Sequence, residues 1–88
     1  MEKKQQKIAR QEVTIDSKVL VRFPSGEIVP YTIVDPNRMD PNHGIISCDS
    51  PLGKALLGNK KGAEVIYTVE NRVIRVSIVY VYPKTKNT

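Results

Sequence analysis

Apolar and polar residues alternate along several segments of the chain, as they do in strands that have one face in a core. The segment Lys18–Phe23, KVLVRF, has this pattern, with valines and a phenylalanine at every second position. A turn of Pro-Ser-Gly at 24–26 follows, and Glu27–Val34 then completes a predicted hairpin. Pro30 has no N–H to donate to a strand ladder, so we expect it at a bulge or at a sheet edge.

The strictest alternation lies near the end of the chain, in Val73–Tyr82. Its alternating members are Ile74, Val76, Ile78, Tyr80 and Tyr82, which are therefore predicted to share one face. This segment is the best candidate for a central core strand. The tight connection Glu70-Asn71-Arg72 joins it to a preceding strand, since Asn71 can adopt left-handed backbone angles.

The start of a short helix is predicted within the segment 48–58, CDSPLGKALLG. Ser50 is the expected N-cap, because its hydroxyl can accept hydrogen bonds from the free amides of the first turn. Pro51 then lies at N1, where a missing N–H costs nothing. Asp49, just outside the helix, favours the positive end of the helix dipole.

The same helix has a predicted apolar side and a predicted end. Leu52, Ala55 and Leu56 fall at i, i+3 and i+4 and form one stripe that needs a core to cover it. Gly58 can take the positive φ that ends a helix. Cys48, at the end of the preceding strand, is expected to be a small buried hydrophobic residue and not a nucleophile.

These elements predict the fold class. Asp35–His43 is expected to be a loop, and Gly44–Cys48 a short strand that leads into the helix. About five strands around one short helix, without a βαβ rhythm, predict an antiparallel α+β domain. This domain spans 13–82, preceded by a polar tail or short helix at 1–12 and followed by a tail at 83–88.

Length and composition agree with one small domain, since the chain has 88 residues, of which 40% are hydrophobic. No apolar stretch is long enough to cross a bilayer, and the first residues contain no apolar segment typical of a secretory signal. The single cysteine cannot form an internal disulfide, as is usual in a reducing compartment. We therefore expect a cytoplasmic protein without a membrane partner.

The net charge of +5 invites a nucleic-acid interpretation, but much of it comes from lysines and an arginine near the two ends. Proteins that bind RNA or single strands usually add aromatic stacking platforms to a basic surface. This chain has one Phe and no Trp, and its tyrosines mostly lie in strand patterns. Binding to nucleic acid is therefore expected to be at most weak and nonspecific.

The polar residues allow two kinds of chemical site to be considered, a hydrolase triad and a metal site, and neither is favoured. A hydrolase triad of Ser50, His43 and Asp49 or Asp40 lacks the turn motif that surrounds such a serine, and Ser50 already has a capping role. A metal site of Asp35, Asp40, His43 and Asp49 lacks the usual ligand spacing. We expect no catalytic residue, no metal site and no cofactor.

The run DSPLGKALLG, followed by Lys60-Lys61-Gly62, closely resembles the C-terminal domain of the GreA/GreB family of transcript cleavage factors. The resemblance extends back through YTIVDP (31–36), the Asp-Pro at 40–41 and GIIS (44–47), and forward through EVIYTV (64–69). It covers roughly 13–82. An FKBP-like fold is implied, which agrees with the α+β pattern.

This resemblance also implies a partner and a binding site. In the Gre factors this domain docks at the rim of the RNA polymerase secondary channel, against the coiled-coil of the largest catalytic subunit. The docking element is the loop before the short helix, which corresponds here to Asp49, Ser50 and Pro51. No prediction of oligomeric state follows from the pattern.

The resemblance further implies where RNA cleavage would come from. Gre factors insert a long N-terminal helical hairpin into the channel, and its acidic tip helps to hold the metal for cleavage. The residues before Val13 would span only about 18 Å as one helix, at about 1.5 Å per residue. We therefore expect a module that docks on the polymerase and modulates elongation without stimulating cleavage.

The alternative is a small FKBP-like domain that binds peptides or isomerises prolyl bonds. Such isomerases hold proline in a pocket of many aromatic side chains with a Trp at its floor. The absence of Trp and the single Phe make this the second interpretation, since a fold alone does not define a function.

Overall fold

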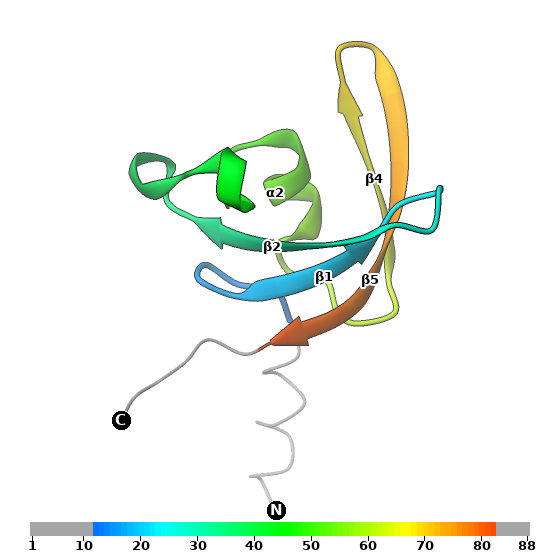
Figure 1. The fold of residues 1–88 in the computed structure, drawn as a ribbon, viewed down its shortest axis with the longest axis horizontal. Helices are drawn as coiled ribbons and strands as arrows, with labels where there is room; N and C mark the ends of the chain where they lie inside the picture. Colours follow the sequence, from blue (N-terminus) through cyan, green and yellow to red (C-terminus); the bar gives the residue numbers. More distant parts are fainter. Residues whose placement is uncertain (1–11, 83–88) are drawn as a thin grey trace, which may run out of the picture.

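The computed structural model describes residues 12–82, which form a curled five-stranded sheet with one short α-helix over it (Figure 1). The strands are β1 (Lys18–Arg22), β2 (Ile28–Val34), β3 (Ile45–Ser47), β4 (Glu64–Val69) and β5 (Arg72–Tyr82). The helix is α2 (Pro51–Leu56), and two 3-10 helices, η1 (Pro36–Arg38) and η2 (Pro41–His43), occupy the predicted loop. The α+β class is confirmed. The predicted tails lie outside the described residues, except for Glu12, which forms a bridge with Lys60.

The strand order is β3-β2-β1-β5-β4. β1 pairs antiparallel with β2 and with β5, and β4 pairs antiparallel with β5. β2 and β3, however, run parallel. The sheet is therefore mixed, where the pattern predicted an antiparallel one, because the chain after β2 passes through two 3-10 turns and begins β3 beside Thr32, instead of forming a tight hairpin.

β1 occupies the centre of the sheet, and its Val19 and Val21 are fully buried. β5, expected to be central, lies beside it and is the longest strand. Its first half pairs with β4 and its second half with β1. β5 therefore joins the two halves of the sheet.

Pro30 lies on β2 at a position with a strand neighbour on one side only. It pairs with Leu20 of β1, whereas β3 begins its pairing with β2 at Thr32. The amide of Thr32 points toward that side and donates to the carbonyl of Gly44. Pro30 lies two positions earlier, so its nitrogen, which has no N–H, faces the same side at a point before β3 begins. The expectation of an edge position is confirmed.

A β-bulge interrupts the pairing between β1 and β5. Leu20 pairs with Tyr80, but the next residue of β1, Val21, pairs with Ile78. Val79 is therefore an extra residue that has no partner of its own on β1. One extra residue reverses the face to which every later side chain of the strand points.

This reversal corrects the predicted facing of β5. Val76 and Ile78, before the bulge, are buried as predicted, but after it Val81 is the buried residue. Tyr80 and Tyr82 lie on the opposite face and are 41% and 40% exposed. The prediction that both tyrosines share one face with Val76 and Ile78 was wrong, because strict alternation in the sequence corresponds to one face only in a strand without an extra residue.

The core lies between α2 and one face of the sheet. It collects apolar side chains from every strand except β3, from α2 and from the residues that precede β1. Its buried members are Val13, Val19, Val21, Ile33, Leu52, Leu56, Val65, Val76, Ile78 and Val81. The predicted stripe of α2 is confirmed, with Leu52 and Leu56 buried and Ala55 half-buried at the margin.

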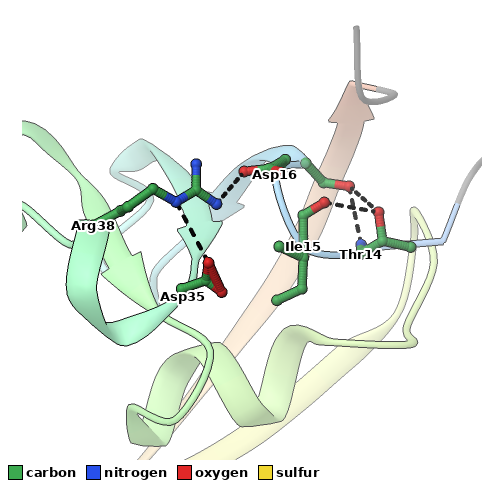
Figure 2. A network of polar contacts seen from close by, with 6 residues as sticks. Thr14, Ile15, Asp16, Asp35 and Arg38 are labelled. Atoms are coloured by element: carbon green, nitrogen blue, oxygen red, sulfur yellow. Dashed lines mark hydrogen bonds and ion pairs between the residues drawn. The ribbon is translucent and has the colours of Figure 1, made fainter. Parts of the chain in front are cut away.

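A polar network ties the turn before β1 to η1. Figure 2 shows the guanidinium of Arg38 between two carboxylates, with its Nη2 2.9 Å from Asp16 and its Nε 3.5 Å from Asp35. The hydrogen bond with Asp16, and then its charge, raise the pKa of Arg38 above its ordinary value. Asp16 itself has a positive φ of 75° and donates its amide to the carbonyl of Ile33. The network therefore holds the 35–43 loop against the sheet through exposed ion pairs.

Candidate functional site

The candidate site is the loop that leads from β3 into α2. β3 ends at Ser47, which is buried, and the amide of Cys48 donates to the carbonyl of Val34 and so continues the contact with β2. Asp49 is exposed, and Ser50 then begins the helix. The loop is therefore only two residues long and is anchored at both of its ends.

Two serine hydroxyls organise the start of α2. The Ser50 hydroxyl accepts from the amide of Gly53 at 3.0 Å and donates to the carbonyl of Ser47 at 2.7 Å. The Ser47 hydroxyl accepts from the amide of Asp49 at 2.9 Å. The predicted N-cap role of Ser50 is confirmed. The role of Ser47 was missed, because a serine that ends a strand has no capping signature in the sequence.

Gly53 lets the first turn of α2 approach the end of β3. A Cβ atom at this position would lie 2.2 Å from the carbonyl oxygen of Ser47, which is backbone and cannot move aside cheaply. Sequence reasoning missed this residue as well. Its signal was available, because a glycine inside a short helical pattern often marks a close approach.

Asp49 and Pro51 are the exposed members of this site. Within residues 12–82 the carboxylate of Asp49 forms no ion pair, and its side-chain contact is a weak one with the Cys48 thiol, 4.0 Å away. Pro51 lies at N1 as predicted. The Asp49, Ser50 and Pro51 set is therefore contiguous: the middle residue holds the helix start and the two outer residues face solvent. Cys48 is only half-buried, although it packs against the core.

The end of α2 is tied to the start of the domain. Gly58 has a φ of 83°, as predicted for the residue that ends the helix, and its amide donates to the carbonyl of Val13. The amide of Val13 donates in turn to the carbonyl of Asn59. The Asn59 side chain also donates to the carbonyl of Ala55, near the end of the helix, at 2.7 Å. Both ends of α2 are therefore held by polar contacts.

The other polar residues of this region do not join the site. His43 Nδ1 lies 2.8 Å from the carboxylate of Asp40, on an exposed loop. The contacts of the Ser50 hydroxyl are with Ser47 and Gly53, as described above, and not with this histidine. Among the described residues, no three His, Cys, Asp or Glu side chains come close enough together to hold a metal ion. No helix in 12–82 has the length and apolar character needed to cross a membrane.

Fold and site together define a small α+β module that presents a rigid, acidic helix start at the end of its sheet. The family model "Transcription elongation factor, GreA/GreB, C-term" matches residues 6–83. The chain belongs to this family, and the match is to its C-terminal domain.

Curated relatives are similar over the same part of the chain. GreA from Oenococcus oeni is 44% identical over 71 residues, which are 78% of this chain and 44% of the relative. GreA from Listeria welshimeri is 48% identical over 54 residues, which are 60% of this chain and 34% of the relative. The chain therefore matches less than half of the length of these relatives.

Solved structures agree with the family and the fold. GreA/GreB from Nitrosomonas europaea has a TM-score of 0.71 and 35% identity, over 88% of this chain and 65% of that one. Gfh1, a GreA factor homolog from Thermus thermophilus, has a TM-score of 0.72 and 26% identity, over 84% of this chain and 50% of that one.

Proposed function

We propose that this chain is a transcription-factor module that binds RNA polymerase through Asp49, Ser50 and Pro51 and modulates elongation. The observation that carries the proposal is the exposed helix start in a chain that belongs to the GreA/GreB family. The partner surface is the coiled-coil of the largest catalytic subunit, near the secondary channel. A protein with this partner acts in the cytoplasm.

The geometry of the loop supports such a contact. The hydrogen bonds of Ser47 and Ser50 hold the loop in one conformation, so binding costs little conformational entropy. The carboxylate of Asp49 complements basic or amide side chains on a partner helix. Pro51 adds a rigid apolar contact beside this charge.

Stimulation of RNA cleavage is not part of the proposed function of these 88 residues. The family model that matches is that of the C-terminal domain, whereas the resemblance assigns cleavage to the N-terminal hairpin of the Gre factors. The chain would therefore compete with a full-length Gre factor for the same surface and leave the RNA intact.

Competition for core RNA polymerase tests the proposal. A fluorescently labelled full-length Gre factor is bound to the polymerase, and this chain is added at near-physiological salt. Displacement is expected, and its absence at high micromolar concentration would exclude the docking proposal. Labelled RNA in backtracked complexes then tests the second part, because RNA shortened only when this chain is added would show a cleavage role.

One observation favours the peptide-binding or isomerase alternative. Phe23 and Tyr31 are half-buried on the helix side of the sheet with ring centroids 6.4 Å apart, and Tyr67 also packs against the core. Burial, and then the charge of Glu27, raise the pKa of Tyr31; burial, and then Tyr31, raise the pKa of Tyr67. Catalysed cis–trans exchange in a prolyl peptide assay would favour this alternative.

A further inference from the structure

The face of the sheet that points away from α2 carries an aromatic and basic surface. Along β1 the buried valines point toward α2, so the residues between them point outward, and the bulge in β5 brings two tyrosines to the same side. We call this set the outer patch. Its members are Lys18, Leu20, Arg22, Lys61, Tyr80 and Tyr82.

The two tyrosines form the centre of the outer patch. Their ring centroids lie 4.9 Å apart with an interplanar angle of 67°, which is an edge-to-face pair. The register places Tyr80 opposite Leu20 and Tyr82 opposite Lys18. Rings held in this way on a β-strand lose little freedom when a flat ligand stacks on them.

Lysine ammonium groups lie over both rings. Lys18 Nζ is 5.5 Å from the ring centroid of Tyr82, and Lys61 Nζ is 5.2 Å from that of Tyr80. Lys18 comes from β1 and Lys61 from the turn before β4, and these two strands are the neighbours of β5 on its two sides. An ammonium group therefore lies over each aromatic ring, and because the lysine side chain is flexible, it can move from the ring to a phosphate when a base stacks there.

The charge of this face is strongly positive. In addition to the two lysines, the strand register places Arg22 and Arg75 outward, and Glu64 is the one acidic residue that the described strands place on this face. None of these four cations forms an ion pair with another residue of the 12–82 region. An anionic partner that also offers flat rings would complement both features.

We infer that the outer patch binds single-stranded nucleic acid without sequence preference, through base stacking on Tyr80 and Tyr82 and through contacts of Lys18 and Lys61 with phosphates. Stacking on aromatic rings is sequence-tolerant, because every base has a π-face. A duplex hides these faces. We expected at most weak binding to nucleic acid because the tyrosines lie in strand patterns. The bulge in β5 instead exposes Tyr80 and Tyr82 on the outer face, so this reason does not apply to them.

This site is distinct from the docking loop. α2 lies over one face of the sheet (Figure 1), and the burial pattern of β1 and the bulge in β5 place the side chains of the outer patch on the other face. Neither tyrosine nor either lysine contacts Asp49, Ser50 or Pro51 in the hydrogen bonds and ion pairs of the described region. The two proposals can therefore be tested independently: loss of polymerase binding would not exclude nucleic-acid binding by the outer patch, and loss of nucleic-acid binding would not exclude the polymerase contact.

Fluorescence anisotropy of a labelled oligo(dT) with the complete 88-residue chain tests the inference. Tyr80→Leu/Tyr82→Leu keeps an apolar surface but removes the rings, and it should weaken binding by about tenfold or more. Tyr80→Phe/Tyr82→Phe keeps the rings and should bind within about twofold of the parent. Both variants need an unchanged thermal transition, which the exposure of the two side chains favours.

Salt dependence supplies an independent measurement. Lys18→Gln/Lys61→Gln should lower the slope of log affinity against log salt by about 1.4, because each phosphate that a lysine neutralises on a single strand contributes about 0.7 to this slope. Lys54→Gln is the matched control, because it also removes a positive charge of a lysine, but from α2 on the other side of the sheet. If the leucine variant does not fold, the lysine variants decide the test.

Three results would overturn the inference. Equal binding by the leucine variant and the parent would assign the affinity to other basic residues of the chain. Tighter binding to a duplex than to oligo(dT) would exclude base stacking as the main contribution. A dimer in sedimentation that the leucine variant disrupts, without any effect on oligo(dT) binding, would assign the patch to a second copy of this chain.

Discussion

The start of α2 and the second half of β5 are both recognisable in the sequence, yet only the first has the predicted orientation. Around α2 each prediction depends on neighbours in the chain: Ser50 caps an amide three residues later, and Gly58 ends the helix two residues after Leu56. In β5 the facing of Tyr80 depends on its pairing with Leu20, which lies far away in the sequence. Local hydrogen bonds can be predicted from a short segment of sequence. The face of the sheet to which a strand's side chains point can be predicted only when its register with the partner strand is known.

The largest effect on stability is expected just after the bulge in β5, which determines the face to which Val81 and Tyr82 point. Val81→Asp would place a carboxylate among core side chains without a partner, and should lower the free energy of unfolding by more than about 3 kcal/mol. Tyr82→Asp, at the next position, faces solvent and should cost about 1 kcal/mol. Urea denaturation compares the two variants. A strand without a bulge would give the opposite order.

Leu56→Ala tests the apolar stripe of α2. The side chain is fully buried, so its truncation should cost about 2–5 kcal/mol, because apolar burial is removed and a cavity is left behind. Affinity for polymerase should fall together with stability, because the packing of α2 against the core positions the docking loop. Lys54→Ala, on the exposed side of α2, is the control and should change stability by less than about 0.5 kcal/mol. Equal stability of the two variants would contradict the assigned core.

Gly53→Ala separates helix propensity from tertiary packing. Alanine is favoured over glycine inside a helix by about 1 kcal/mol, so an isolated α2 would become more stable. Here the added Cβ would clash with the carbonyl of Ser47, and the net result should be a loss of about 1–3 kcal/mol. Thermal unfolding measures it, at about 4–8 °C per kcal/mol for a domain of this size. A raised melting temperature would show that the close approach to β3 is not required.

The smallest effect on stability is expected at Asp49, together with the largest effect on binding. Asp49→Ala removes a charge near the helix start that is worth about 0.3–1 kcal/mol, so the melting transition should be nearly unchanged. Affinity for RNA polymerase should fall strongly. Glu27→Ala removes an exposed carboxylate from the β1–β2 turn and should leave binding unaffected. If Asp49→Ala binds polymerase like the parent, another surface makes the contact.

Several features of the fold could be predicted, because they depend on short-range patterns. The five strands and the helix lie within a few residues of the expected segments, and Pro30 lies at a local edge. The parallel pairing of β2 with β3 could not be predicted. Nothing in the 35–43 segment indicates that two 3-10 turns return the chain in a parallel direction, since this path is held by contacts of Arg38 with Asp16 from before β1.

The candidate site was predicted only in part. Ser50 and Pro51 carry signals of helix capping in the sequence, and they lie where those signals place them. Ser47 and Gly53 act through a close approach between the end of β3 and the first turn of α2. Such an approach is a property of two packed elements. Ser47 therefore has no distinctive neighbour pattern, and a glycine within the helical pattern at Gly53 indicates a close approach without indicating its partner.

The sequence alone determined the class of the domain, the position and caps of its helix, and the family to which the chain belongs. These follow from periodicity and capping, which act over a few residues, and from a contiguous motif. The tertiary structure alone decided the parallel pair and the face on which Tyr80 and Tyr82 lie. The reason is that strand direction and register are settled between segments distant in the chain, where one extra residue, Val79, exchanges the core face for the solvent face.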